Sequence, residues 1–185
     1  MSRGFRRALL VTAIAAPAPL AAGIASGADR AVAAPTAAST SYSCTGAPTT
    51  LFDDTNTKAV SNWGSTPTFS TKGVPYCLSQ IITYHWDGGK GAAPGSIALL
   101  APNGTTLGPF KAMGSSGQGG APNVNWTAKV PTSPKPVVIE GTYACVDSSP
   151  ATWSQDAMSG GRGFCKVIVK KALASGGGVL RCTGP

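Results

Sequence analysis

The residues best suited to chemistry in this sequence are one histidine and one run of polar side chains around a tryptophan. His85 is the only histidine and follows Tyr84 in a stretch rich in β-forming residues. A general base needs a nucleophile and an orienting carboxylate beside it. Asp87 and Ser148 have the right chemistry, but no spacing ties them to His85. We therefore expect a structural histidine, hydrogen-bonded in a sheet or at its rim, and no catalytic residue.

The segment 147–154 is the more distinctive candidate. Asp147 and Ser148 precede a proline, which favours a turn closed by a side-chain-to-backbone hydrogen bond. In a binding site, the face of Trp153 would stack on a sugar ring. The polar ligand contacts would come from Asp147, Ser148, Thr152 and Ser154. The structural alternative is that Asp147 ties down a long loop while Trp153 caps the core.

Metal and glycosidase chemistry have weaker support. A Ca²⁺ ion would use Asp147 or Asp156, because hard cations take several oxygen ligands. The regular Asp spacing of a calcium loop is absent, so we expect no cofactor. A glycosidase needs two facing acids. The acids that could supply such a pair are Asp53, Asp87, Glu140 and Asp147. The sequence has no G-x-S-x-G elbow, phosphate loop or dinucleotide fingerprint.

Residues 1–34 have the three parts of a secretory signal. The positive head contains Arg3, Arg6 and Arg7. An uncharged apolar run over 8–24 and small residues follow it. A retained membrane anchor is the alternative, which Pro17 and Pro19 disfavour. The Arg6-Arg7 pair leaves twin-arginine export open beside the general route. We expect a secreted, periplasmic or cell-surface protein with no membrane contact after cleavage.

Cysteine use fits export. All five cysteines follow the signal, and none forms a CxxC pair. Disulfides are therefore expected in place of zinc. Cys145 and Cys165 fall in two predicted strands, which could bring their Cβ atoms within about 3.5–4.5 Å if the strands pair. Cys44–Cys182 is the second expected bridge, because chain ends are often close. Cys44–Cys77 remains open as a rival, and one thiol is left over.

The rest of the pattern predicts an all-β fold. From Thr49, short apolar runs are cut by Gly, Pro and Asn, with no sustained periodicity of 3.6 residues. Many short strands of this kind are typical of a sandwich or barrel. We expect a two-sheet antiparallel sandwich, jelly-roll-like, with about eight strands. Its expected boundaries are a flexible linker over 35–48, the sandwich over 49–171 and a Gly-rich tail over 172–185.

One hairpin stands out among the predicted strands. The strands expected from the pattern are 76–86, 96–100, 107–112, 125–130, 142–146 and 163–171. The second and third of these are joined by Pro102–Thr105. The Asn-Gly pair inside that connection suits a type I′ turn, in which both central residues have positive φ.

The chain resembles a group of bacterial secreted β-sandwich modules. The residues that match are Ile82–Gly91, Gly141–Gln155 and Gly160–Phe164. The pattern of the group runs TYHWN-G-G early, then DSDPATWS-x-N and SGG-x-GF late, and it covers about residues 50–169. This chain departs at Ser149, where the pattern has Asp, and at Asp156, where it has Asn. It also has cysteines at 145 and 165, where apolar residues are usual. The resemblance implies the fold and export, and no chemistry.

The function that we expect is a secreted, non-catalytic module that binds an extracellular glycan or another envelope component. A structural or protein-interaction domain of the cell envelope, with no small ligand, is the alternative, and a hydrolase is third. Three arginines of the head contribute to the formal net charge of +8. Lys166, Lys170 and Lys171 form a small cluster that fits a solvated strand face, so no nucleic-acid partner is expected.

The four tryptophans separate these functions. A binding module should show an aromatic face beside polar side chains in a hollow of the surface. A purely structural domain should bury all of Trp63, Trp86, Trp126 and Trp153.

Overall fold

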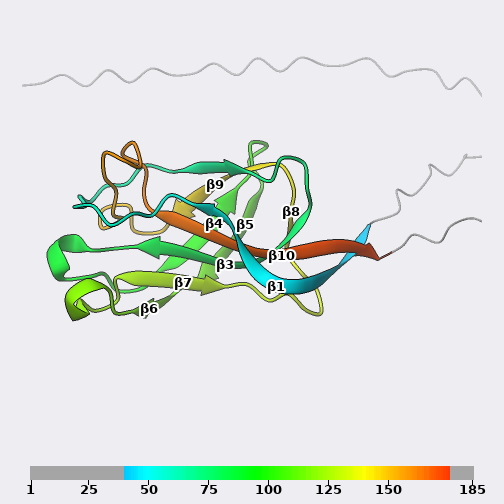
Figure 1. Cartoon of the computed structure of the whole chain (residues 1–185), viewed down its shortest axis with the longest axis horizontal. Coiled ribbons are helices and arrows are strands. Elements are labelled where there is room, and N and C mark those ends of the chain that lie inside the picture. The colour runs from blue at the N-terminus through cyan, green and yellow to red at the C-terminus, as the bar shows by residue number, and fades with distance from the viewer. Residues whose placement is uncertain (1–39, 176–185) are drawn as a thin grey trace, which may run out of the picture. The chain divides into compact units, whose positions relative to one another are not determined.

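The protein folds as a sandwich of two antiparallel β-sheets (Figure 1). This computed structural model describes residues 40–175, so the expected signal over 1–34 lies outside it, as does Cys182. The strands are β1 (Ser41–Asp53), β2 (Thr68–Ser70), β3 (Tyr76–Tyr84), β4 (Ser96–Leu100), β5 (Thr106–Lys111), β6 (Met113–Ser115), β7 (Asn125–Lys129), β8 (Val138–Ile139), β9 (Thr142–Asp147) and β10 (Cys165–Ser175). Two short 3-10 helices, η1 (Asp87–Gly89) and η2 (Gln118–Gly120), complete it. Within 40–175, no helix is long and apolar enough to cross a membrane.

The principal strands pair from the ends of the domain inward, the first with the last. β1 pairs with β10, β2 with β9, β3 with β7 and β4 with β5, all antiparallel. With the short strands β6 and β8 set aside, the sheets read β1-β10-β3-β7 and β2-β9-β4-β5. This is the strand order of a jelly roll with eight principal strands, and it confirms the predicted fold class.

The core lies between the sheets and follows the two-residue period of the strands. On β10, Cys165, Val167 and Val169 are buried, while the residues between them are only half-buried. On β3, Ile81 and Thr83 point inward in the same way. Each fully buried aliphatic side chain contributes about 1.5–3 kcal/mol relative to exposure. The alternation therefore fixes which face of each strand meets the core.

The predicted hairpin is present as β4 and β5, but its turn differs from the type I′ expectation. Asn103 does not have positive φ, whereas Gly104 has φ of 84°. The Gly104 amide donates to the Ala101 carbonyl at 2.9 Å, and the Asn103 side chain accepts from the Thr105 amide at 2.9 Å. The proline ring holds the φ of Pro102 negative, so the turn centres on Pro102 and Asn103 and leaves only Gly104 left-handed.

The domain begins and ends differently from the expected boundaries. β1 starts at Ser41, so residues 41–48 are strand and not linker, and β10 continues to Ser175, into the expected tail. Ser41 is the register partner of Ser175. The sequence hides this pairing because β1 is an edge strand of mostly exposed small residues. Backbone hydrogen bonds to β10 hold β1 in place. These bonds do not require alternating apolar side chains, so the sequence of β1 shows no such alternation.

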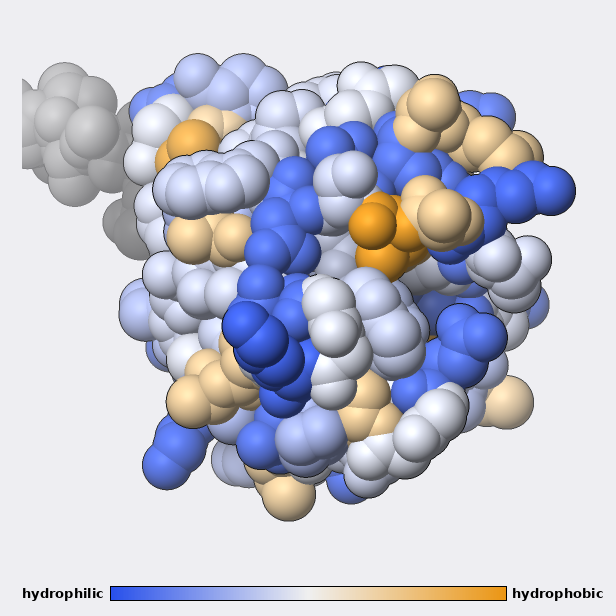
Figure 2. Space-filling view, turned by 90° about the vertical axis from the view of Figure 1, so that its left-hand side faces the viewer, coloured by the Kyte–Doolittle hydropathy of each residue, from blue (hydrophilic) through white to orange (hydrophobic). Residues whose placement is uncertain are grey.

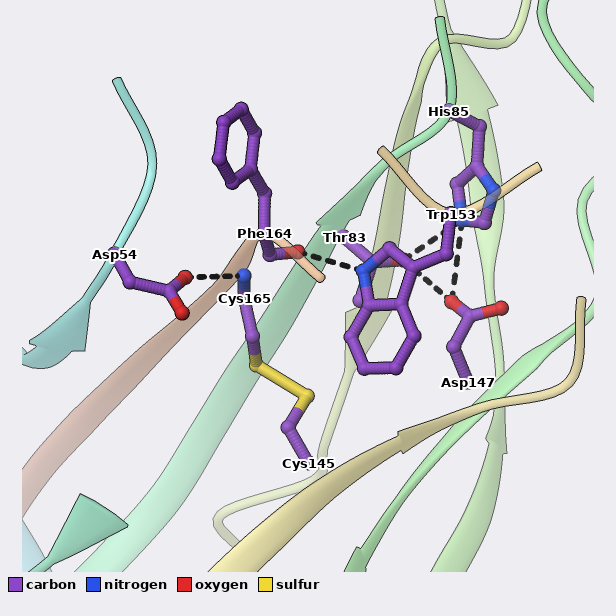
Figure 3. The surroundings of a disulfide bond; sticks show 8 residues. All are labelled: Asp54, Thr83, His85, Cys145, Asp147, Trp153, Phe164 and Cys165. Carbon is purple, nitrogen blue, oxygen red and sulfur yellow. Dashed lines mark hydrogen bonds and ion pairs between the residues drawn. A yellow bond between two sulfur atoms is a disulfide. The ribbon is translucent and has the colours of Figure 1, made fainter. Parts of the chain in front are cut away.

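Two disulfides join parts of this framework. Cys145 is bonded to Cys165 with Cα atoms 6.7 Å apart (Figure 3). Their strands, β9 and β10, do not pair but lie in different sheets, so the bridge crosses the core. Cys44 is bonded to Cys77 with Cα atoms 5.8 Å apart, and not to Cys182 as first expected. This is the rival pairing, and it joins β1 to β3, the two strands on either side of β10.

Replacing the inter-sheet disulfide should cost more stability than replacing the other one. Cys145→Ala/Cys165→Ala reopens the shorter loop, with a sequence separation of 20 against 33. Chain entropy alone gives about 3 kcal/mol for either loop. Both Cys145 and Cys165 are fully buried, whereas Cys44 is half-exposed, so the first variant also leaves a cavity. Urea unfolding of both double variants measures the difference, and a larger loss for Cys44→Ala/Cys77→Ala would contradict it.

Candidate functional site

Trp153 lies inside the core, where its ring is only 2% exposed. Its indole N–H donates to the Phe164 carbonyl at 2.9 Å (Figure 3). A Cβ on Gly163 would overlap the indole, so this ring packs directly on backbone. The ring face predicted to stack on a sugar is thus covered by the protein, and Trp153 occupies the core-capping position of the structural alternative.

Asp147 and His85 form the centre of a buried polar cluster. His85 Nε2 lies 3.1 Å from Asp147 Oδ2, and the Thr83 hydroxyl donates to the same oxygen at 2.7 Å. His85 Nδ1 lies 2.9 Å from the Thr152 hydroxyl. The other oxygen of Asp147 accepts from the Ser149 amide at 2.7 Å, which is the turn predicted before the proline. Figure 3 shows the side chains of Thr83 and His85, at the end of β3, converging on Asp147 at the end of β9.

This cluster places a hydroxyl, an imidazole and a carboxylate in a row, as a hydroxyl nucleophile requires. His85, however, is fully buried and stacks on Trp126 with ring centroids 3.7 Å apart. Thr152 is the only half-buried member of the row, and its hydroxyl is also 3.0 Å from the Ser149 hydroxyl. The cluster therefore satisfies buried polar groups inside the sandwich, as the structural reading of His85 predicts.

The remaining predicted contacts are also bound to backbone. Ser148 accepts from the Ser96 amide at 2.9 Å, and Ser154 accepts from the Trp86 amide at 2.8 Å. Asp156 Oδ1 accepts from the Ser159 amide at 2.7 Å. Across the described chain, no group of three or more His, Cys, Asp and Glu residues is placed to hold a metal ion.

A hollow in the surface lies elsewhere, on the outer face of the six-stranded sheet. We call it the outer groove, and its volume is about 730 Å³. Its lining residues are Thr55, Asn56, Thr57, Lys58, Ala59, Val60, Ile82, Thr83, Tyr84, Trp86, Gln118, Gly119, Asn125, Phe164 and Lys166. A volume of this order accommodates a ligand of a few sugar rings or a comparable small molecule.

Three adjacent strands supply the floor of the outer groove. Ile82 and Tyr84 alternate with the inward residues of β3, so they point away from the core. The register sets Ile82 beside Lys166 of β10 and Tyr84 beside Asn125 of β7. The ring of Tyr84 lies 6.3 Å from that of Phe164, which is itself buried. The floor is therefore formed by the half-buried side chains of Tyr84 and Ile82, bordered by an ammonium and an amide.

Loops supply the sides of the outer groove. Residues 55–60 follow β1, next to β10 in the sheet, and η2 precedes β7 on the other side of β3. These segments bring the amides of Asn56 and Gln118 to the rim. Figure 2 looks onto this loop end and shows a mostly hydrophilic surface with a small, strongly hydrophobic patch within it. This end of the molecule thus combines hydrogen-bonding groups with a small apolar patch.

The charges around the outer groove are partly balanced. Lys166 Nζ lies 2.9 Å from Asp53 Oδ2. Partial burial acts to raise the pKa of Asp53, but hydrogen bonds from Thr55 and Lys166 outweigh it and hold that pKa below its ordinary value. Burial raises the pKa of the Tyr84 phenol, against a hydrogen bond from the Gln118 backbone. Tyr84 therefore enters the groove as a neutral donor at physiological pH.

Asp54 anchors the start of the loop that borders the outer groove. Its Oδ1 accepts from the Cys165 amide at 2.7 Å, and its own amide donates to the Cys165 carbonyl at 3.3 Å (Figure 3). Its Oδ2 is buried without a hydrogen-bond partner. Burial raises the pKa of Asp54 to about 6, against the lowering by the Cys165 amide and the charge of Arg162.

Comparison with known protein families, curated proteins and solved structures gave no match to this chain. The assignment of a site therefore depends on the geometry of the molecule alone.

Sequence reasoning did not single out the outer groove, although one of its signals is present. The stretch 76–86 is a predicted strand, and its period of two sets Ile82, Tyr84 and Trp86 on the face opposite to Ile81 and Thr83. Two aromatic side chains on the outward face of a strand are a binding signal. The loop residues that complete the groove come from distant parts of the chain, and no local pattern connects them.

Replacing Trp153 should lower the stability of the protein. Trp153→Ala removes a large ring that is 2% exposed and frees the Phe164 carbonyl, so we expect a loss of roughly 3–5 kcal/mol in the free energy of unfolding. Trp153→Phe keeps most of the volume and should lose less. Thermal and urea unfolding measure both. A Trp153→Ala variant as stable as the parent would show that the ring is not part of the core.

The raised pKa of Asp54 should make stability depend on pH. The folded state holds the proton more tightly than the unfolded chain, whose ordinary value is 3.8. The free energy of unfolding should therefore fall as the pH rises from about 4 to about 6. Asp54→Asn stays neutral and should lack this decline, giving a difference of roughly 1 kcal/mol because solvent screens a partly exposed group. Urea unfolding of both proteins across that range tests it, and parallel curves would contradict it.

Proposed function

We propose that this protein is an exported, non-catalytic module that binds a glycan in the outer groove. The observation that carries the proposal is the lining of the groove, in which the aromatic residues Tyr84 and Trp86 lie among residues with amide and hydroxyl side chains. A sugar ring presents a C–H face to an aromatic ring and hydroxyls at its edge. The groove offers a partner for each of these.

The hydrogen-bonding groups at the groove suit sugar hydroxyls. The Gln118 amide both donates and accepts, as sugar hydroxyls do. Asn56 Oδ1 accepts from the Lys58 amide and Asn125 Nδ2 donates to the Ser116 carbonyl, so these two amides offer a ligand only their remaining hydrogen-bonding capacity. Lys58 adds an ammonium donor, whereas Lys166 is paired with Asp53. Among the described lining residues none is a carboxylate, whereas hydrolysis of a glycoside commonly uses two. These features support binding without cleavage.

Export is the second part of the proposal. Both disulfides join cysteines that lie in strands of the sandwich. Such bonds form and persist in an oxidising compartment, which supports export. The charged head and apolar run of residues 1–34 support a secretory route to it.

A glycan array probed with the exported protein tests this function. We expect binding to at least one class of glycan, and Trp86→Ala should weaken it about tenfold or more, because a ring at the centre of a contact carries much of its affinity. Phe110→Ala is the matched control, since Phe110 is a half-buried aromatic residue on β5 of the other sheet.

Two results would count against the proposal. Absence of binding to every glycan class on the array would overturn it. Binding that is weakened by Phe110→Ala but not by Trp86→Ala or Tyr84→Ala would place the site on the other sheet.

A further inference from the structure

Trp63 differs from the buried tryptophans of this protein. Its side chain is 73% exposed, whereas Trp126 is 1% and Trp153 is 2% exposed. Single apolar residues on a surface are common and need no explanation by themselves. The backbone of Trp63 adds a second and independent observation.

Trp63 has φ of 66°, in the left-handed region. A side chain with a Cβ atom is strained there, and for a bulky residue the conformation is a genuine outlier. Such strain persists only where the surroundings impose it, and it is concentrated at functional sites. The protein therefore keeps an unfavourable backbone conformation at the residue whose ring it exposes.

Hydrogen bonds on both sides of Trp63 impose this conformation. Before it, Ser61 and Gln155 exchange backbone hydrogen bonds of 2.8 Å each. After it, the Gly64 amide donates to the Trp153 carbonyl at 2.9 Å. The Gln155 side chain also donates to the Asn62 carbonyl at 3.3 Å. The ring is thus presented from a fixed stretch of chain and not from a loose loop.

The same stretch borders the outer groove. Residues 55–60 line the groove, and Trp63 lies three residues further along the chain. The Asn62 side chain donates to Asp87 Oδ1 at 2.7 Å, and Asp87 follows the groove residue Trp86. The chain neighbours of Trp63 and of Trp86 are therefore in contact, which sets the two tryptophans on adjoining parts of the loop end.

We propose that Trp63 is a second ligand platform, which stacks on a sugar unit of the bound glycan that extends beyond the outer groove. The inference rests on the proposed function and adds to it the length of the ligand, an oligosaccharide longer than the groove itself. Because the backbone that carries the ring is fixed before binding, no loop has to be ordered on contact, so stacking gains affinity at small cost. The left-handed residue carries an exposed ring between two anchored neighbours.

Trp63→Gly separates this role from a structural one. Glycine adopts positive φ without strain, so the variant should be as stable as the parent or more stable. The glycan array should hold short and long members of each oligosaccharide series. We expect Trp63→Gly to weaken binding to the long members about three- to tenfold and to leave the short members unchanged. Trp63→Tyr, which restores a ring, should recover most of that loss.

The possible results distinguish the inference from the proposed function. If Trp63→Gly binds long and short members as the parent does, the inference falls and the groove remains the site. If the parent binds no glycan, both fall together. If Trp63→Gly changes the mass measured by light scattering from that of the parent, the ring contacts a second copy of the chain, and the inference is overturned. A lower melting temperature with unchanged binding would assign the ring a structural role.

Discussion

The packing of the Trp153 indole against backbone is the constraint on which the loop end of this sandwich depends. A Cβ on Gly163 would overlap the indole, and a Cβ on Gly64 would overlap the backbone of Gly163. Three layers of chain therefore stack at a separation that only glycine permits. Since Gly64 follows Trp63 and Phe164 follows Gly163, the buried ring sets the position of the outer groove and of the exposed tryptophan together.

The polar cluster of His85 and Asp147 is a second fixed point of the interior. Buried polar groups are costly unless each finds a partner, and here the carboxylate serves Thr83, His85 and the Ser149 amide at once. Such a network tolerates few alternative arrangements. It holds the end of β3 to the turn after β9, which are the segments that lead to Trp86 and to Trp153.

The fold was readable from the sequence where a pattern depends on near neighbours. The alternation around Cys165 and the turn at Gly104 gave two strands and a hairpin. The Cys145–Cys165 pair was predicted from strand pairing, but the two strands lie in different sheets and the bond crosses the core. Features that depend on distant partners were not readable, such as the edge strand from Ser41 and the Cys44–Cys77 bond. The candidate site shows the same division. The Asp147 turn was visible in a short motif, whereas the groove joins residues from five separate segments.

The register of β1 with β10 determines how this domain can be attached to anything else. Ser41 and Ser175 are partners at one end of the pair, and Asp53 and Lys166 are partners at the other, beside the groove. Nine residues of strand at about 3.3 Å each separate these ends by roughly 30 Å. A tether, a fusion partner or a solid support joined at Ser41 or Ser175 therefore leaves the end that carries the outer groove unobstructed, and immobilisation through either point should preserve access to it.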